Sequence, residues 1–567
     1  MHIYGNIKNK GKVFNFDIVS DSKKTQDSER IFTFSDKKIF IYIDGTIAKL
    51  SGQICELTRH QNSIEEKIAY LYSIRFNFEG HILGFYNIFL FDYTTKELRI
   101  IRDSRGTRSV FYSHDEDNFI FSSNQNLIIK SLKKITLNQD KLMEFLNMDL
   151  VLTKKTYLNE ILRVLPKHYL IYKDNLLQEE KYEFSENLFK VEQDNDVKQD
   201  FKRYLFRGVT SFLNQSKKTG IMMSGGLDSS AIAISLKENN YTNVSTYSAN
   251  FDHIDHKNNI HEENFRKNIT ELTSYTHTSI QMESKSPLVP IKKFTKILNQ
   301  PILTPNIYLF EAIAHKLKDD GIETILDGND GDNTVSHGFE ILFYYITNLK
   351  LIKFTREVYL YSKFKKTNFI RLVFVLLKQA VKEILNIKDK QNSETMLKKE
   401  LAIKMSSNGN LSYFSSHERK ISHELHFLSN EFRNNFFRYF GIENLSPFYY
   451  EELIQFCLNM PLTNKLNEGY TRKILRDFLS DYLPDYHVNR DKSNLASALV
   501  KNFSLSDLEI IKQEYKNINQ HLLMLIDTHK LENILTILDK GEQINEKDLI
   551  KLQVFISANT FLNQNNL

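Results

Sequence analysis

The sequence predicts a mixed α/β and α+β protein with two domains, and three observations carry that prediction. The chain has 567 residues, more than one hydrophobic core usually organises. Short β-branched and aromatic runs dominate residues 1–185, whereas strand-like and helix-like segments alternate after residue 200. We therefore expect a layered αββα domain over 1–185 and a parallel α/β sheet with a helical extension over 200–567.

The elements of the first domain are short strands bounded by turn signals. Apolar and aromatic runs predict strands at 38–43, 86–91, 118–121 and 168–172. A helix is expected over about 138–148, and the polar stretch 192–200 is the expected linker. These elements favour stacked sheets for the first domain.

The second domain alternates strands and helices. Strands are expected at 219–223, 243–248 and 322–326, with helices over 229–238 and 261–272. This order predicts a parallel sheet covered by helices on both faces. Ligands of such sheets bind at the carboxyl ends of the strands, so the residues that follow 223 and 326 are the first candidates for a site.

Composition excludes several classes of protein. Two cysteines, Cys55 and Cys457, cannot supply a disulfide framework or a cysteine-rich metal site, and no apolar signal core opens the chain, so a cytoplasmic enzyme is expected. The net charge of +5 does not indicate nucleic-acid binding. The apolar segment 369–387 contains charged residues and predicts a packed helix rather than a membrane span.

A local excess of basic residues stands out between Lys350 and Lys404, in a helix-like stretch that also carries Tyr and Phe. Such an excess is typical of a solvated helix face. A surface that binds a polyanion or a peptide is the alternative, and the sequence leaves both open. The segment around 343–404 therefore has no assigned role at this stage.

The first motif follows the strand at 219–223 and reads Ser224-Gly225-Gly226-Leu227-Asp228-Ser229-Ser230. Glycines permit a sharp turn with exposed N–H groups, and hydroxyls at a helix N-terminus add donors, so the loop is suited to a phosphate chain. A carboxylate among phosphates requires a cation, so Asp228 predicts Mg²⁺. An ordinary Gly-rich turn is the alternative. The motif resembles the pyrophosphate loop of the ATP pyrophosphatase superfamily.

The second motif follows the strand at 322–326 and reads Asp327-Gly328-Asn329-Asp330-Gly331-Asp332. Three carboxylates within six residues are typical of a shared cation, although Asp-Gly and Asn-Asp are also plain turn formers. Because this loop ends a strand of the same predicted sheet, we expect it to lie beside the first motif.

Together the two motifs resemble the synthetase domain of asparagine synthetase and its relatives, the β-lactam synthetases and lasso-peptide cyclases. The resemblance implies a sheet of the adenine nucleotide α-hydrolase type. It implies that Asp332 and Asp228 hold Mg²⁺ on the pyrophosphate of ATP, that Gly328 and Gly331 belong to the nucleotide site, and that Ser248 lies against adenine. Asn333 replaces the usual Glu of the second motif.

Later segments extend this resemblance. Glu443-Asn444-Leu445-Ser446-Pro447-Phe448 is similar to the Glu-x-Arg-x-Pro-Phe-Leu-Asp of relatives, with Tyr450 in place of the Asp. By that match Glu443 assists proton removal from the attacking amine. The run 465–476, followed by Arg490-Asp491-Lys492, is similar to the closing pattern, and Lys492 falls on the lysine directed at the phosphates. Such a lysine would stabilise charge that develops during adenylation.

The first domain resembles the family's glutamine amidotransferase domain, an Ntn-hydrolase-like fold, most clearly over residues 102–112. Active members place a cysteine after the initiator methionine, where this chain has His2. Neither of the two cysteines can replace a nucleophile that uses its own α-amine as base. Asp44-Gly45 and Gly84-Phe85 also depart from the glutamine pocket, so we expect no glutaminase activity.

These observations predict an AMP- and pyrophosphate-forming ligase that adenylates a carboxylate and transfers it to an amine, using ATP and Mg²⁺. A role in peptide or specialised-metabolite modification is expected. The alternatives are an asparagine synthetase that uses free ammonia and a non-catalytic nucleotide-binding member. The expected partners are a small-molecule or peptide carboxylate, an amine, and either a second copy of the chain or a biosynthetic partner protein. Nucleic acid and membrane are not expected.

Overall fold

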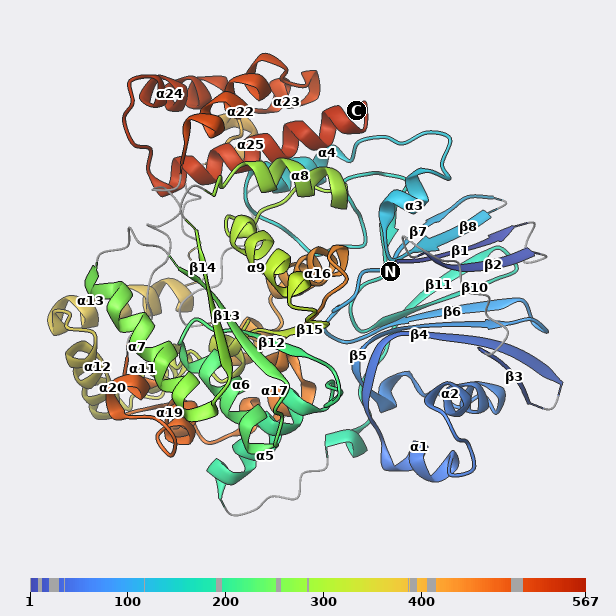
Figure 1. Ribbon diagram of the computed structural model, residues 1–567, viewed down its shortest axis with the longest axis horizontal. Coiled ribbons are helices and arrows are strands. Elements are labelled where there is room, and N and C mark those ends of the chain that lie inside the picture. Colours follow the sequence, from blue (N-terminus) through green and yellow to red (C-terminus); the bar gives the residue numbers. More distant parts are fainter. Residues whose placement is uncertain are drawn as a thin grey trace.

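A computed structural model of the protein describes residues 2–8, 13–19, 30–34, 36–116, 118–189, 196–250, 256–282, 285–385, 387, 395–404, 415–490 and 503–567. Figure 1 shows two stacked sheets on one side of the molecule and a separate sheet surrounded by helices on the other. The C-terminal helices lie above this separate sheet (Figure 1). The predicted fold class, layered sheets in the first part of the chain and a parallel α/β sheet in the second, is confirmed.

The first domain contains two antiparallel sheets. One has the order β2 (Val13–Val19), β1 (His2–Lys8), β8 (Asn118–Ser122), β7 (Phe111–His114), β9 (Leu162–Arg163). The other has the order β11 (Leu176–Lys181), β10 (His168–Lys173), β6 (Glu97–Arg102), β5 (Ile82–Asp92), β4 (Lys37–Leu50), β3 (Ile31–Phe34). The predicted strands at 38–43, 86–91, 118–121 and 168–172 all lie within these elements.

Alternating side chains of the central strand β5 explain the αββα layering. Phe89 and Phe91 enter a core shared with the facing sheet, whereas Ile88 and Leu90 enter a core beneath the helices. The helices on that outer face are α1 (Gly52–Leu57) and α2 (Ile64–Ser73), while α3 (Gln125–Ile129) contacts the other sheet. Because a strand alternates its side chains, a strand such as β5 with large apolar residues on both faces fits only between two covered faces.

The second domain is built on a parallel sheet of order β14-β13-β12-β15-β16. Its strands are β12 (Thr219–Met222), β13 (Val244–Asn250), β14 (Thr276–Gln281), β15 (Thr324–Leu326) and β16 (Glu443–Leu445). Ile325 and Leu326 of β15 enter two different apolar clusters, one on each face of the sheet. The predicted covering of both faces by helices is therefore confirmed.

One face is covered by α5 (Val197–Thr210), α6 (Leu227–Glu238), α7 (His256–Thr273), α17 (Glu451–Asn459) and α19 (Lys473–Leu479). The other is covered by α8 (Val289–Leu298), α9 (Ile307–Asp319), α16 (Glu424–Tyr439) and α25 (Glu546–Gln564). Beside α25 lie α4 (Gln139–Leu146), α22 (Leu505–Lys516), α23 (Gln520–Leu525) and α24 (Thr528–Asp539).

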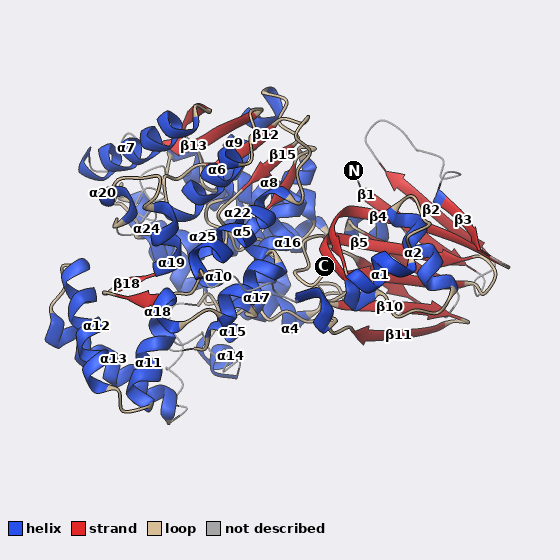
Figure 2. Cartoon of the chain, turned by 90° about the horizontal axis from the view of Figure 1, so that it is seen from below, coloured by secondary structure: helices blue, strands red, loops and turns tan. Residues whose placement is uncertain are grey.

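Smaller elements connect the two motifs to the rest of the domain. The helices are α10 (Gly331–Thr334), α14 (Lys399–Lys404), α15 (His417–Ile421), α18 (Leu462–Lys465) and α20 (Asp485–Val488). A short hairpin pairs β17 (Leu466–Asn467) with β18 (Tyr470–Thr471). Three helices, α11 (Phe339–Thr347), α12 (Leu351–Phe364) and α13 (Phe369–Ile384), form a layer beside that hairpin, as Figure 2 shows.

Two sequence predictions need correction. The expected linker extended to residue 200, but α5 begins at Val197 because the carboxylate of Asp196 accepts hydrogen bonds from the first free backbone amides and caps the helix. The segment 369–387 does form a helix, α13, but only one of its faces is packed. Among the described residues, no helix is both long and apolar enough to cross a bilayer.

The two domains are joined by the loop 102–108, which carries three arginines. Arg102 binds Glu431 at 2.7 Å, Arg105 binds Glu451 at 2.7 Å, and Arg108 binds Glu443. All three acidic partners belong to the second domain. Arg102 and Glu431 are almost fully buried, so this contact forms part of the interior of the protein.

Candidate nucleotide and magnesium site

The first motif forms a tight turn between β12 and α6. Gly225 has φ +70°, a conformation that side chains other than glycine rarely adopt, and Gly226 is the residue that precedes the helix. No side chain among the described residues caps the first amides of α6. These amides and the exposed hydroxyl of Ser224 therefore meet the requirements of a phosphate site at a helix N-terminus.

The rest of the motif fixes this turn in place. Leu227 is buried in the core, and the Ser229 hydroxyl donates to the Gly226 carbonyl at 3.2 Å. Ser230 is fully buried, with its hydroxyl 3.3 Å from Nε2 of His487. Burial lowers the pKa of His487 to about 4, so this histidine is neutral at pH 7. Binding of ATP by the three serines stays a prediction.

Asp228 and Asp332 lie together at the end of the sheet. Nη1 of Arg472 is 3.0 Å from Asp228 Oδ2 and 2.5 Å from Asp332 Oδ1, so both carboxylates converge on one cationic nitrogen. The pKa of Arg472 is raised by the two carboxylates, although burial opposes this. Carboxylates that already share one positive charge form a donor set that fits Mg²⁺. Asp228 and Asp332 are the residues that would hold it.

The glycines of the second motif allow this approach. A Cβ on Gly331 would lie 2.5 Å from Oδ1 of Asp228, and a Cβ on Gly328 would lie 2.9 Å from Cβ of the same aspartate. Because such distances are shorter than van der Waals contact, any larger residue would push the second loop away from Asp228. The two glycines thus position Asp332 beside Asp228.

The other two carboxylates of the second motif do not join them. Asp327 is buried and accepts hydrogen bonds from Arg433, Asn444 and Ser446, each at 2.6–2.7 Å. Asp330 binds His426 at 2.9 Å. Of the three carboxylates in the second motif, only Asp332 therefore lies beside Asp228, because residues of helix α16 and strand β16 hold the other two. Among the described residues no cluster contains three potential protein ligands for a metal.

Ser248 follows Tyr247, the partner of Met222 in β12, so it lies near the carboxyl edge of the sheet, whereas Glu443 does not. The hydroxyl of Ser248 is 3.1 Å from Nε2 of His277, whose pKa burial lowers to about 4. Glu443 begins β16 in register with Thr324, at the opposite end of the short strands from the two loops, and its carboxylate binds Arg108. The structure therefore does not bring Glu443 into contact with Asp228 or Asp332, and its catalytic role stays a prediction.

Lys492 lies outside the described residues. Arg490, two positions earlier, is described: its Nη1 donates to the Gly225 carbonyl at 2.7 Å, and its guanidinium lies 4.2 Å from the ring centre of Phe265. Arg490 thus contacts the backbone of the first motif. The catalytic assignment of Lys492 stays a prediction.

A cavity of about 300 Å³ lies away from the loops, between the segment 141–163 and α16. Its lining is largely apolar, with Arg163 and Lys141 as buried cations. Helix α16 separates it from the second motif, because His426 and Arg433 of the same helix hold Asp330 and Asp327.

Two residues that organise the site, Arg472 and Arg433, were not predicted from the sequence. Arg472 falls within the run 465–476 but received no role, and Arg433 received none either. The signal for Arg472 was its place in a run that resembles the family's closing pattern. For Arg433 there was no local signal, because its contact with Asp327 joins positions about a hundred residues apart.

A parallel sheet with two glycine-containing loops at its carboxyl edge is typical of a nucleotide-binding α/β domain, and here it is joined to an amidotransferase-like domain. Comparison with known protein families identifies the family. Residues 200–563 match the family model described as asparagine synthase, and residues 76–183 match the one described as glutamine amidotransferase domain. The chain belongs to the asparagine synthase family. This confirms the resemblance stated from the sequence motifs.

The individual proteins to which the chain is similar share little sequence identity with it. The chain is similar to amidase chyE of Penicillium rubens, with 26% identity over 163 residues, 28% of this chain and 24% of that protein. It thus spans about a quarter of that relative's length. Two solved structures align at low scores. Glutamine phosphoribosylpyrophosphate amidotransferase from B. subtilis, complexed with ADP and GMP, has 13% identity over 42% of this chain and 57% of its own, with TM-score 0.21. An allosteric regulatory enzyme of purine biosynthesis has 11% identity over 57% and 74%, with TM-score 0.22.

Proposed function

We propose that the protein is an ATP-dependent amide-bond ligase that forms AMP and pyrophosphate and does not use glutamine. Membership of the asparagine synthase family supports ATP-dependent amidation. The observation that carries the proposal is the convergence of Asp228 and Asp332 beside the uncapped N-terminus of α6. A phosphate cradle next to a pair of carboxylates suits a nucleotide bound with its metal.

The proposed reaction has two steps. An oxygen of the substrate carboxylate attacks the α-phosphorus of ATP, and the bond to the bridging oxygen breaks to release pyrophosphate. An amine then attacks the carbonyl carbon of the acyl-adenylate, AMP leaves with the electron pair of the broken C–O bond, and the amine gives up a proton. Mg²⁺, when bound, would supply charge neutralisation at the pyrophosphate.

The residues of this chain would act mainly by holding the phosphates. The amides of the first residues of α6, which begins at Leu227, would donate to phosphate oxygens, and Arg472 would hold Asp228 and Asp332 in place. Lys492 is proposed to reach the same phosphates, since Arg490 fixes the chain on Gly225. Glu443 is proposed to take the proton from the amine, although it is paired with Arg108 in this structure.

The proposed lack of glutaminase activity is supported by the pocket of the first domain. Asp44 is buried and bound by both Arg108 at 2.9 Å and Arg438 at 3.0 Å. These guanidiniums hold the pKa of Asp44 below its usual range, so the cluster stays charged at pH 7. Nε of Arg108 lies 2.9 Å from where a Cβ on Gly45 would be. An ion cluster therefore fills the space beside Asp44-Gly45. The amine is thus proposed to belong to a peptide or a specialised metabolite.

ATP–pyrophosphate exchange with purified protein and Mg²⁺ tests the proposal. We expect exchange that depends on one carboxylate substrate, and we expect Asp228→Asn to abolish it. Asp477→Asn is the matched control, because the ion pair of Asp477 among the described residues is with the nearby Lys473 of the same helix, α19. Exchange in wild type that Asp228→Asn leaves unchanged would contradict the site assignment.

The same assay separates the other functions. Aspartate with ammonium giving asparagine and AMP would make the protein an ammonia-dependent asparagine synthetase. Measurable ATP binding without exchange for aspartate, glutamate and candidate peptides would favour a non-catalytic nucleotide-binding protein. Amide formation from glutamine would refute the proposed loss of glutaminase activity.

A further inference from the structure

Helix α13 exposes an apolar stripe that no other described element covers. Its exposed side chains are Ile370 (76%), Phe374 (68%), Leu377 (41%), Val381 (52%) and Ile384 (56%). Isolated exposed apolar residues are common on protein surfaces, but a continuous row of large ones marks an interaction site.

The stripe has the spacing of a helix that pairs with another helix. Its members follow one another at steps of four, three, four and three residues, which is the a/d repeat of a coiled coil. A second apolar face of α13, with Leu376 and Ala380, is buried against α11 and α12. Internal packing therefore accounts for one face of α13 and leaves the other without a partner among the described residues.

The charges beside the stripe specify the partner. Arg371 and Lys378 are exposed and occupy the positions that directly follow Ile370 and Leu377, which are e positions of the repeat. The residues on the other side, Val373 and Ala380, are uncharged. In paired helices, charges at e positions contact flanking residues of the partner, and unlike charges favour pairing.

Self-pairing of α13 is disfavoured by these same residues. In an antiparallel pair of two copies, e positions face e positions, so Arg371 and Lys378 would meet each other. In a parallel pair they would face the other flank, where Val373 is uncharged and Ala380 is uncharged and buried. Neither arrangement neutralises the basic flank, so a second copy of this chain is a poor occupant.

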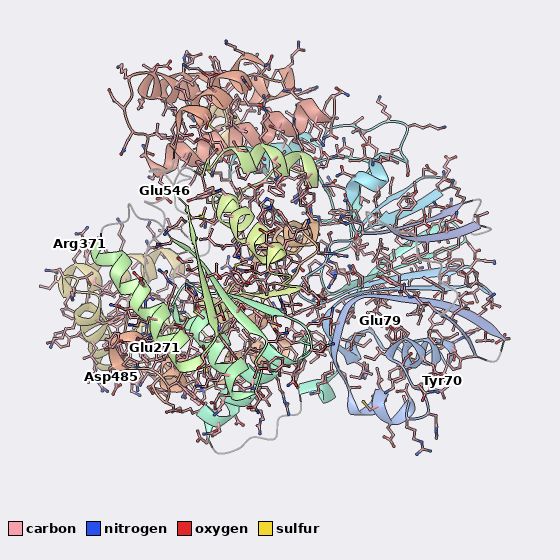
Figure 3. All side chains as sticks on the ribbon, in the orientation of Figure 1. Tyr70, Glu79, Glu271, Arg371, Asp485 and Glu546 are labelled. Atoms are coloured by element: carbon pink, nitrogen blue, oxygen red, sulfur yellow. The ribbon has the colours of Figure 1, made fainter. Side chains whose placement is uncertain are left out.

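We propose that α13 docks an amphipathic helix of another polypeptide, one with an apolar stripe and acidic flanking residues. The 16 residues of α13 span about 24 Å, enough for two heptads of pairing. Arg371 lies at the rim of the molecule, on the side opposite Tyr70 and Glu79 of the first domain, as Figure 3 shows. The rim position leaves room for a helix alongside α13.

Contacts connect this surface to the nucleotide site. In α12, which packs against α13, the Glu357 carboxylate accepts from the Gly469 amide at 2.8 Å. A Cβ on Gly469 would lie 2.4 Å from the amide nitrogen of Tyr361, so the hairpin β17–β18 presses directly on α12. Arg472 follows that hairpin. A polypeptide docked on α13 would therefore be linked, through α12 and the hairpin, to Arg472, which binds Asp228 and Asp332.

A pair of designed peptides tests the proposal on the full chain. Both would be fluorescent helices of three heptads with Leu at a and d; one has Glu and the other Lys at e and g. By anisotropy, we expect the Glu peptide to bind roughly tenfold more tightly than the Lys peptide, with a difference that shrinks as salt rises. Phe374→Glu and Leu377→Glu should each abolish binding. Leu176→Glu, at an equally exposed position of the first domain, is the control.

Charge reversal makes the test specific to the basic flank. The double variant Arg371→Glu with Lys378→Glu should invert the preference, so that the Lys peptide binds more tightly. Four results would overturn the proposal: no binding of the Glu peptide at 0.2 mM, equal binding of both peptides, binding to phosphatidylglycerol vesicles instead, or wild-type dimers that Phe374→Glu dissociates. The last two would identify a membrane surface or a second copy as the occupant.

Discussion

Removing the carboxylate of Glu431 should loosen the junction between the two domains. Glu431 is buried between Arg102, at 2.7 Å, and Arg163, at 3.3 Å. Both guanidiniums are buried as well, and they hold the pKa of Glu431 below its usual range against the opposing effect of burial. In Glu431→Ala the two cations would remain in the interior without this carboxylate.

The expected cost follows from that burial. Breaking a buried ion pair by deleting one partner costs about 3–5 kcal/mol, whereas an exposed pair contributes about 0–1 kcal/mol. Glu183 offers the exposed comparison: it binds Lys167 at 2.6 Å, but 69% of its side chain is exposed. Glu183→Ala should therefore change stability little, and Glu431→Gln, which keeps the volume and one acceptor, should fall between the two alanine variants.

Hydrogen exchange followed by mass spectrometry would locate the effect. A loss of 3–5 kcal/mol corresponds to exchange roughly 10²- to 4 × 10³-fold faster wherever opening of the junction governs exchange. We expect this in peptides from loop 102–108 and from α16, with little change in α2. Exchange in Glu431→Ala that matches Glu183→Ala would show that the buried charges are compensated in another way and would refute the reasoning.

Three further predictions concern the nucleotide site and its surroundings. Gly331→Ala should abolish pyrophosphate exchange and weaken ATP binding, because the new Cβ would lie 2.5 Å from Asp228 Oδ1. Gly52→Ala is the control: a Cβ there would have no atom within 4 Å in the described structure, so neither assay should change. Arg472→Ala should lower the melting temperature in the absence of metal, because Asp228 and Asp332 would lose their shared cation. Millimolar Mg²⁺ should then raise the melting temperature of the variant more than that of the wild type. An equal rise in both proteins would speak against a metal at this pair. Burial lowers the pKa of His277, His417 and His487 to about 4 in the folded protein, below the 6.5 expected when unfolded. Unfolding therefore takes up protons, and the stability of the protein should fall as the pH drops from 6.5 to 4. In thermal melts, His487→Asn should flatten that fall, whereas His529→Gln, at an exposed position, should not.

Local patterns were sufficient for much of this fold. The alternation of strand-like and helix-like segments located β12, β13 and β15, and Gly225-Gly226 marked the turn into α6. Such features depend on residues that are close in the sequence. The position of Asp332 beside Asp228 was also predictable, because the carboxyl ends of parallel strands meet at one edge of the sheet.

Contacts between distant residues could not be predicted in this way. Asp327 appeared to be one of three equivalent carboxylates, yet Arg433 and Asn444 occupy it, and both come from elements more than a hundred residues later. The exposed stripe of α13 was hidden for a related reason. An apolar helix can bury all of its faces or only one, and the number of neighbours that reach it is a property of the tertiary structure.

Helix α16 connects the first domain with the candidate nucleotide site. One side of it meets the first domain through Glu431, while His426 and Arg433 hold the loop that carries Asp332. Glu431 is buried, and its described partners, Arg102 and Arg163, both come from the first domain. Removing that domain would leave this part of α16 without the arginines that compensate its charge. A first domain without glutaminase activity would therefore still be needed to keep the second motif beside Asp228.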